Sequence, residues 1–299
     1  MPSLDLLASF VSAARHAGFA GAARELGHSP SAVAKNVARL EAELGVRLFH
    51  RTTRQVSLTP DGQEMLDRCA RIVDEVDALE TAAAGAKSEV RGTLRIDAPV
   101  AYGHGVVLPV LASLLTRFPQ LELDARFSDH VVDLIREGLD AAIRIGPLAD
   151  SRLVGRRIDE QTLLTCASPG YLQRHGAPKK PEDLTRHRCL LFRLPSTGRD
   201  RPWQYRRGKR SIQWTPEGSM RLGDGESLLK LAAADLGVIQ LPHYIAEPAL
   251  QAGALVEVLR EYRPAPTPIS LVYPSHRLVP PRVRAFADAL AAALKRAPG

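Results

Sequence analysis

Cysteine, aromatic residues and long apolar runs are all scarce in this sequence. Its three cysteines, Cys69, Cys166 and Cys189, are odd in number and far apart, which fits reduced, buried thiols better than a disulfide framework. No run of apolar residues approaches the length of a membrane span, and the first residues lack the basic-then-apolar order of a signal peptide. We therefore expect a cytoplasmic protein that has no membrane partner.

Sequence signatures of catalysis and metal binding are also missing. There is no Gly-x-Ser-x-Gly elbow and no P-loop, and GDGESL, which begins at Gly223, lacks the third glycine of a dinucleotide-binding fingerprint. The nine histidines are dispersed, without a His-x-x-x-His or Cys-x-x-Cys pair. We predict that the protein is not an enzyme and holds no metal and no cofactor. An α/β enzyme stays open as an alternative, because a fold alone does not decide an activity.

The length and charge of the chain favour two domains and an anionic partner. With 299 residues and 45% hydrophobic residues, the chain is long for one domain and apolar enough for sizeable cores. Its formal charge of +7 and its pI near 9.6 favour a polyanionic partner, although many basic proteins bind none. Basic residues gathered on one face of a helix would be a more specific sign of such a partner.

A sharp corner between two helices is predicted around Gly27, Ser29 and Pro30. The glycine suits a helix C-terminus, the serine can accept hydrogen bonds from the free amides of the next helix, and the proline suits its first position. Four apolar residues of that second helix recur with helical periodicity and predict its buried face: Val33, Val37, Leu40 and Leu44. Small and basic residues lie on the opposite face, which suits entry into a DNA groove: Ser31, Lys35, Ala38 and Arg39. An ordinary amphipathic helix with a solvated basic edge is the alternative.

A small hairpin is predicted to follow residues 3–45, whose three helices form a helix-turn-helix pattern. Two short alternating runs, RLFHR and QVSLT, flank Thr52, Thr53 and Arg54. Arg51 and Arg54 would lie at the hairpin tip, where they can contact the sugar-phosphate backbone or a narrow minor groove. The hairpin would then be a wing beside the recognition helix, with solvated turn arginines as the alternative.

A long helix with a narrow apolar seam is predicted over about residues 60–87, with Thr59 as its N-cap. The apolar positions of this helix are spaced 4, 3, 4, 3 and 4: Met65, Cys69, Ile72, Val76, Leu79 and Ala83. Because a narrow seam between charged flanks cannot be buried within a thin segment, we expect a partner helix from a second copy to cover it. The pattern therefore predicts dimerisation through this helix, followed by a linker at GAKSEVRG.

Strands and helices alternate from residue 91 onward. The first group comprises TLRIDA, a helix over residues 108–118, LELDARF, a helix near residues 131–137, and AAIRIG. Further units follow at TLLTCAS, at GVIQLP after a helix of residues 227–236, and at ISLVY before a closing helix of residues 281–295. This order is typical of βαβ units and predicts a mostly parallel sheet.

Several of these segments carry a family resemblance. The run GFAGAARELGHSPSAVAKNVARLEAELGVRLFHRTTRQVSLTPDG resembles the N-terminal motif of LysR-type transcriptional regulators, with Ala-Ala, Leu-Gly, Leu-Glu, Leu-Phe and Leu-Thr-x-x-Gly at matching spacing. Ala98-Pro99, Arg144-Ile145-Gly146 and Cys166-Ala167-Ser168-Pro169 also stand as in one large branch of this family. The resemblance therefore covers essentially the whole chain.

The resemblance implies an α/β fold with an N-terminal all-α winged helix-turn-helix. It implies a DNA-binding domain over residues 1–59, a linker dimerisation helix over residues 60–90, and an effector-binding domain over residues 91–299. The last domain is similar to a periplasmic binding protein, with lobe I at residues 91–162 and 268–299 and lobe II at residues 163–267.

The function that the resemblance implies is transcriptional regulation. A small-molecule effector would modulate binding to double-stranded promoter DNA, and the chain would form a homodimer and, further, a homotetramer. Two alternatives remain, a stand-alone small-molecule-binding α/β protein and an enzyme without regulatory DNA binding.

The resemblance also implies which residues bind DNA. They come from the corner, the second helix and the wing: Arg24, Ser29, Pro30, Ser31, Ala32, Lys35, Asn36, Arg39, Arg51 and Arg54. Ala20 and Ala34 depart from the family pattern, since a hydroxyl is usual at both positions. Because lost hydroxyls remove candidate contacts, we expect a lower affinity or a readout shifted to Ser31, Lys35 and Asn36.

The effector is expected in the cleft between the lobes, where two helix N-termini offer free amides. The expected site consists of these residues: Pro99, Val100, Ala101, Tyr102, Ser128, Asp129, Arg144, Gly146, Ser168, Asp224 and Ser227. Acidic residues near the mouth and the missing amide of Pro99 favour a mostly neutral or aromatic effector with at most one acid group. Arg144 offsets part of this charge, unless it pairs with a lobe acid such as Asp140, which is the alternative.

The most basic stretch of the chain, residues 186–210, contains Trp203 and Tyr205. Arginines beside aromatic residues suit single-stranded nucleic acid. The turn formers of residues 195–198 instead predict a solvated loop and hairpin on a lobe rim, which we favour. A redox-sensing thiol at Cys166 or Cys189 would need an exposed, electropositive setting, so we favour structural thiols.

Overall fold

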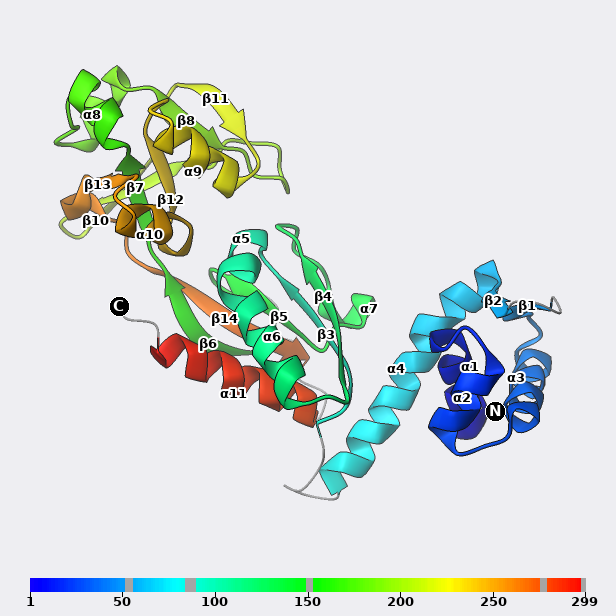
Figure 1. Ribbon diagram of the computed structural model, residues 1–299. Helices are drawn as coiled ribbons and strands as arrows, with labels where there is room; N and C mark the ends of the chain where they lie inside the picture. The colour runs from blue at the N-terminus through cyan, green and yellow to red at the C-terminus, as the bar shows by residue number, and fades with distance from the viewer. Residues whose placement is uncertain (52–55, 84–89, 149–152, 275–278, 297–299) are drawn as a thin grey trace. The chain divides into compact units, whose positions relative to one another are not determined.

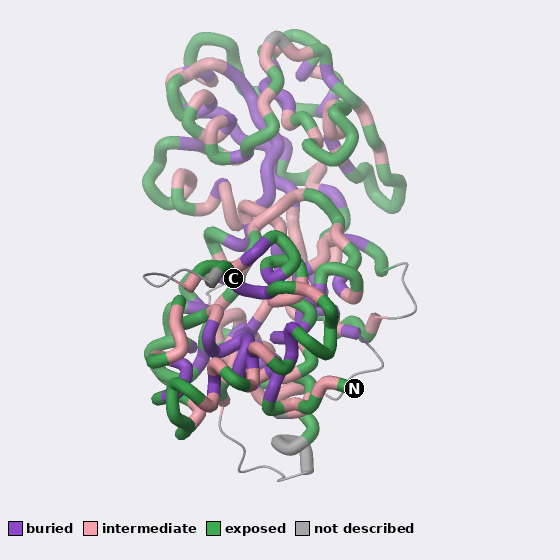
Figure 2. The backbone as a smooth tube through the Cα atoms, turned by 90° about the vertical axis from the view of Figure 1, so that its right-hand side faces the viewer, coloured by how far each residue is buried: buried purple, intermediate pink, exposed green. Residues whose placement is uncertain are grey.

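The computed structural model describes residues 1–51, 56–83, 90–148, 153–274 and 279–296. The chain divides into two compact units, Met1–Glu89 and Val90–Gly299, which we call the head and the two-lobed unit. Each unit is described by itself. In Figure 2 the buried stretches of chain lie inside the units, whereas the loops are mostly exposed.

The head contains a helical core and a short hairpin. Its elements are α1 (Leu4–Arg15), α2 (Phe19–Leu26), α3 (Pro30–Leu44), β1 (Phe49–Arg51), β2 (Val56–Leu58) and α4 (Pro60–Ala83). The predicted corner is present, because Gly27 ends α2 in the left-handed region at φ +66° and the Oγ of Ser29 accepts from the amide of Ala32 at 3.2 Å. The predicted N-cap Thr59 likewise accepts from the amide of Gly62 at 2.9 Å.

The buried face of α3 ends one turn earlier than the periodicity predicts. Leu44 is 37% exposed, so the prediction that it belongs to the core is wrong. Glu41 is buried instead, and its Oε1 accepts from the amides of Leu48 and Phe49 at 2.8 and 3.2 Å. The chain turns back at Gly45, so β1 covers the last turn of α3 at Glu41 rather than at Leu44.

The N-terminal half of α4 belongs to the core of the head. Cys69 and Ala70 are buried with the residues of α1 and α3, and Met65 and Val73 are packed against this core. The prediction that the whole seam needs a second copy is therefore wrong for Met65 and Cys69. A single-helix pattern does not reveal that α1 packs against the same side of α4.

Lobe I is built on a mixed five-stranded sheet of order β4-β3-β5-β14-β6. The strands are β3 (Gly92–Ala98), β4 (Leu121–Phe127), β5 (Ala141–Ile145), β6 (Leu153–Gln161) and β14 (Thr267–Pro274). The helices are α5 (Val100–Tyr102), η2 (Gly103–Val107), α6 (Leu108–Arg117), α7 (Leu134–Glu137) and α11 (Pro281–Arg296), of which α6 and α11 pack side by side against the sheet (Figure 1).

Lobe II contains several short sheets. Its strands are β7 (Leu163–Ala167), β8 (Cys189–Phe192), β9 (Trp203–Arg207), β10 (Arg210–Trp214), β11 (Gly218–Leu222), β12 (Ile239–Pro242) and β13 (Val256–Val258). Its helices are α8 (Pro169–His175), η3 (Pro181–Arg186), α9 (Gly225–Ala233), α10 (His243–Gln251) and η4 (Arg260–Tyr262). The chain enters lobe II after β6 and leaves it at β14, and these two strands pair antiparallel in lobe I.

The sheets are less parallel than the βαβ pattern predicts. β3 runs parallel to β4 and β5, but β14 is antiparallel to β5 and β6, and β7 is antiparallel to β12 and β13. The prediction of a mostly parallel sheet is therefore wrong outside β3–β5 and β8–β11. The cause is the return of the chain from lobe II, since β14 must run opposite to the strand that carried the chain outward.

One apolar helical stretch is longer than we expected from the sequence. Among the described helices, Val100–Arg117 is long and apolar enough to cross a membrane by length and composition alone. Val107, Leu111 and Leu114 of this stretch are buried in the core of lobe I. One side of the stretch therefore belongs to the core of lobe I, while 33% of its residues are buried in all.

Candidate functional site

The exposed face of α3 presents the small and basic residues that the sequence predicts. Ser31, Lys35 and Arg39 are exposed, whereas Val33 and Val37 on the other face are fully buried. The Nε of Arg39 donates to the Oε1 of its neighbour Glu43 at 3.1 Å. An exposed pair at this spacing contributes only about 0.3–0.5 kcal/mol, so the guanidinium remains available to a phosphate.

The other residues of the predicted DNA-binding set differ in their accessibility. Arg24, Ser29 and Pro30 are exposed and Ala32 is half-buried. Asn36 is half-buried, and its Nδ2 donates to the Oγ of the buried Ser9 at 2.9 Å and ties α3 to α1.

The predicted wing is present as the antiparallel pair of β1 and β2. Arg54 lies outside the described residues, and of Arg51 only the backbone in β1 is described. The pair places the hairpin next to α3, and both elements line a depression with Lys35 and His50 on its wall.

A cavity of about 420 Å³ in the two-lobed unit is lined by residues of both lobes. Seven residues of the predicted effector set line it: Pro99, Val100, Ala101, Ser128, Asp129, Arg144 and Asp224. A volume of this size suits a small metabolite of one ring or a short chain, since ligand pockets commonly enclose about 300–1,000 Å³.

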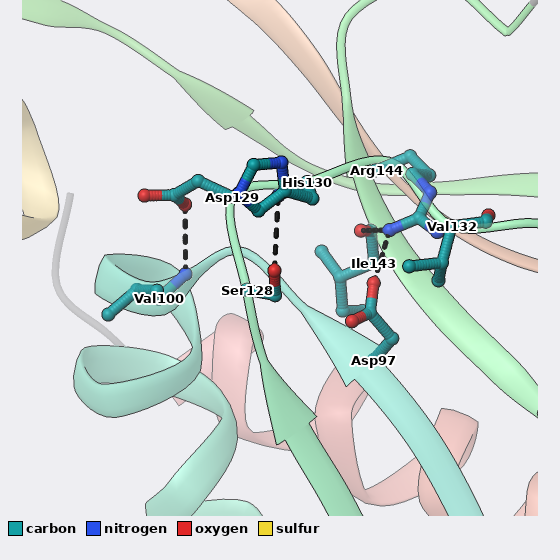
Figure 3. A network of polar contacts seen from close by, with 8 residues as sticks. All are labelled: Asp97, Val100, Ser128, Asp129, His130, Val132, Ile143 and Arg144. Atoms are coloured by element: carbon teal, nitrogen blue, oxygen red, sulfur yellow. Dashed lines mark hydrogen bonds and ion pairs between the residues drawn. The ribbon is translucent and has the colours of Figure 1, made fainter. Parts of the chain in front are cut away.

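Both helix N-termini at the cavity are already occupied by carboxylates of the chain itself. The Oδ1 of Asp129 accepts from the amide of Val100 at 3.1 Å (Figure 3). Asp224 accepts from the amides of Glu226 and Ser227 at 3.2 and 2.9 Å, and its hydrogen bonds with Ser227 lower the pKa of its carboxyl group. Three of the amides that could hold an anionic ligand are therefore already bonded to carboxylates of the chain.

Arg144 lines the cavity, but its charge is balanced within lobe I. Its Nη1 donates to the Oδ1 of Asp97 at 2.6 Å and its Nη2 to the carbonyl of Val132 at 3.1 Å, so the guanidinium points toward Asp97 (Figure 3). The alternative that Arg144 pairs with an acid of its own lobe is confirmed, but the acid is Asp97, because Asp140 binds Arg282 at 3.0 and 3.2 Å.

Four residues of the predicted effector set do not line the cavity: Tyr102, Gly146, Ser168 and Ser227. Tyr102 is fully buried and its hydroxyl donates to the Oδ2 of Asp159 at 3.0 Å. Ser168 caps α8 and donates to the Oδ1 of Asp235 at 2.6 Å. Each of these two hydroxyls therefore binds a carboxylate within its own lobe.

Arg201 is one of several cavity residues that are absent from the predicted effector set, and it is the charged one with no carboxylate bonded to it among the described residues. Its Nη2 donates to the carbonyl of Gln240 at 2.7 Å, and its guanidinium lies 4.9 Å from the ring centroid of Phe192. Burial lowers the pKa of Arg201 to about 10, so the side chain is still charged at neutral pH. Arg201, Trp203 and Tyr205 are spaced by two residues, so in an extended chain their side chains share one face, and this spacing could have placed Arg201 on the inner face.

The hairpin that we favoured for the basic stretch is present as β9 and β10, but the prediction that it is solvated is wrong for its aromatic residues. Trp203 and Tyr205 are each 1% exposed in the core of lobe II, so they offer no stacking surface to nucleic acid. Arg207 pairs with Glu182 at 2.7 Å on the surface.

The thiols and the metal-ligand residues show no reactive cluster. All three cysteines are buried, and burial raises the pKa of Cys166 and of Cys189 to about 12. Across the described part of the chain, no group of three or more His, Cys, Asp or Glu side chains is arranged to hold a metal ion. The thiols are therefore poor candidates for redox sensing.

A winged helix-turn-helix and a two-lobed unit with an internal cavity, in one chain, define a transcriptional regulator with an effector-binding domain. Residues 4–63 match the bacterial regulatory helix-turn-helix protein, lysR family, and residues 87–295 match the LysR substrate binding domain. The chain belongs to the LysR-type family of transcriptional regulators.

Relatives of known name agree with this assignment. The chain is 33% identical over 296 residues to YhjC, an uncharacterised transcriptional regulator of Escherichia coli K12, covering 99% of both chains. It is 35% identical over 289 residues to the E. coli regulator DmlR, covering 95% of this chain and 92% of that protein. These proteins are transcriptional regulators and not enzymes, so the enzyme alternative is set aside.

Solved structures extend the likeness to the full fold. CrgA, a LysR-type regulator from Neisseria meningitidis, aligns with a TM-score of 0.63 at 31% identity, covering 97% of this chain and 98% of that chain. Full-length AphB of Vibrio cholerae aligns with a TM-score of 0.60 at 23% identity, covering 97% of this chain and 99% of that one, and this likeness concerns the fold alone.

Proposed function

We propose that the exposed face of α3 enters the major groove of promoter DNA and that the β1–β2 hairpin contacts the flanking backbone. The observation that carries this proposal is the exposure of Ser31, Lys35 and Arg39 along one face of a helix whose other face is buried. The basic side chains would neutralise phosphates, and Ser31 near the N-terminus of α3 would reach base edges.

We propose further that residues 1–59 bind DNA, that residues 60–90 connect and dimerise, and that the cavity of residues 91–299 binds the effector. Ser128 suits such a role, because its Oγ accepts from the amide of His130 at 3.1 Å and keeps its own proton to donate. Promoter DNA as the partner favours a cytoplasmic location.

The C-terminal half of α4 supports dimerisation, but through a shorter exposed apolar seam than the sequence predicts. Ile72 and Leu79 are 49% and 60% exposed, and Val76 between them is partly buried. Three apolar residues at spacings of 4 and 3 form a stripe that a second copy of α4 can cover. Ala83, the last position of the seam, lies in α4, but its side chain is outside the described residues. A homotetramer would need a second interface between copies of the two-lobed unit.

Selection from a random DNA pool tests the function. Full-length protein should enrich duplexes that contain an interrupted inverted repeat, because a dimer of heads presents two copies of α3. Enrichment of no sequence over the input pool would contradict sequence-specific regulation, and enrichment of a single half-site would contradict the dimer.

A further inference from the structure

Two arginines line the effector cavity, and they differ in how their charge is balanced. Arg144 faces the carboxylate of Asp97 at 2.6 Å. Arg201 has no carboxylate within ion-pair distance among the residues that the structure describes, and its Nε is buried without a hydrogen-bond partner. Loss of water around a cation is costly when no carboxylate bonds it, and Asp129, which attracts Arg201 from beyond ion-pair distance, offsets only part of the cost of burial.

The rest of the cavity opposes a second acid group on the ligand. Three carboxylates line it, those of Asp129, Asp224 and Glu226. Asp129 and Asp224 already accept the helix N-terminal amides that would otherwise attract an anion. A dianionic ligand would therefore meet repulsion at both helix ends and attraction at Arg201 alone.

The walls between these charges are largely apolar. Side chains that face the ligand space come from both lobes: Val100, Ile145, Phe192, Leu194, Leu241 and Ile245. Phe192 also holds the guanidinium of Arg201, whose centre lies 4.9 Å above its ring. One end of the cavity thus suits a single anionic group, and the remainder suits a hydrocarbon or aromatic body.

We propose that the effector is a monocarboxylate with an apolar body and that its carboxylate pairs with the guanidinium of Arg201. The proposal rests on the cavity being the effector site, and it names the ligand class for that site. Arg201 presents donors in a planar fork that matches a carboxylate, while Gln240 and Phe192 hold it in position. The ligand's carboxylate supplies the directly bonded partner for Arg201 that the described residues do not, since Asp129 acts on it only from beyond ion-pair distance.

Matched probes test this pairing in the full-length protein. Benzoate, 3-phenylpropanoate and octanoate are titrated beside their primary amides, and phthalate and succinate serve as dianions, with melting temperature and calorimetric Kd as readouts. At least one monocarboxylate should bind. Arg201→Gln should weaken its binding by about tenfold or more and leave the matched amide unchanged, since only the charged group loses a partner.

Two further variants control the comparison. Arg199→Gln removes an exposed arginine two residues away and should leave the binding of both the carboxylate and its amide unchanged. Without ligand, Arg201→Gln should melt at or above the wild-type temperature, because it removes a half-buried charge that no carboxylate of the described residues bonds. A fall of more than about 4 °C would overturn the proposal, since the guanidinium would then be a structural group.

Three other results would overturn the proposal. They are binding of no monocarboxylate, tighter binding of a dianion than of the monoanions, and an equal loss of carboxylate and amide in Arg201→Gln. Failure of the proposed function is a separate result. If a monocarboxylate binds through Arg201 but leaves promoter affinity unchanged, the ligand class stands and the regulatory role of the cavity does not.

Discussion

Cations are handled differently in the head and in the two-lobed unit. On α3, Lys35 is exposed and forms no ion pair with any described residue. In lobe I, Arg144 and Arg282 are buried against Asp97 and Asp140. A phosphate-binding surface needs cations that water can leave at little cost, whereas an arginine inside a lobe needs a carboxylate to compensate for the water it has lost.

The largest effect that follows from this contrast concerns the buried pair of lobe I. Arg282 and Asp140 are 8% and 5% exposed at their side chains, and Asp140 also accepts from the amide of Arg95 at 2.9 Å. Asp140→Ala should destabilise the two-lobed unit by about 3–5 kcal/mol, because it leaves a buried guanidinium without its carboxylate. Urea unfolding followed by circular dichroism measures the loss.

An exposed pair of the same lobe provides the control. Arg126 and Glu137 are 50% and 41% exposed, so Glu137→Ala should cost no more than about 1 kcal/mol. Equal losses in Asp140→Ala and Glu137→Ala would break the contrast, since lobe I would then gain nothing from burying its charges.

The second effect extends the contrast to apolar residues along α4. Cys69 is 4% exposed within the head, whereas Ile72 and Leu79 are open to a partner. The double variant Ile72→Glu, Leu79→Glu should weaken dimerisation by about a hundredfold or more, because two carboxylates would be buried between helices without partners. Its melting temperature should remain near that of the wild type.

Sedimentation equilibrium of the full chain checks this expectation. Glu75, which is exposed on the same helix, serves as the matched position, and Glu75→Gln should leave the dimer intact. A double variant that still sediments as a dimer would show that α4 is not the interface.

Local signals in the sequence were sufficient to predict the corner of the head. Gly27, Ser29 and Pro30 act within one turn of chain, and the structure uses the glycine and the serine as the pattern predicts. Local signals could not show that Glu41 is buried and Leu44 exposed, because the side of α3 that is covered depends on where β1 returns. Periodicity describes one helix, whereas burial depends on its neighbours.

The cavity was predictable only in part for the same reason. Pro99 and Asp224 follow strands and begin helices, so their place at the cavity follows from chain order. The partner of Arg144 depends on which strands become neighbours, and β3 places Asp97 beside β5. Arg201 belongs to a stretch whose charge pattern resembles a solvated loop, and its spacing of two residues from Trp203 was the one local sign of an inward-facing position.

The third effect is smaller and concerns the free cation of α3. Lys35→Ala should weaken DNA binding about equally at all sequences and reduce the slope of log affinity against log salt concentration by about 1. Fluorescence anisotropy with labelled duplexes measures this slope when the salt concentration is varied from about 50 to about 200 mM. Lys230→Ala removes an equally exposed lysine from α9 and should leave the slope unchanged.

Asn36 sharpens the third comparison, because it belongs to the same helix but is bound to Ser9. Asn36→Ala should lower the stability of the head by about 1 kcal/mol and change the salt slope little. A reduced slope in Asn36→Ala together with an unchanged slope in Lys35→Ala would reverse the assignment of the two faces.

The smallest effect is expected at the thiols. With a pKa of about 12 at Cys166 and Cys189, only about one thiol in 10⁵ is ionised at pH 7, and the thiolate is the form that peroxide oxidises. Burial also raises the pKa of Cys69, which lies in the head core. Treatment of the folded protein with hydrogen peroxide should therefore leave promoter affinity unchanged, and a sulfenic-acid probe should label none of the three until urea unfolds the chain. Labelling of Cys189 in the folded protein, with a matching change in affinity that Cys189→Ser abolishes, would show that the two-lobed unit senses oxidants as well as ligands.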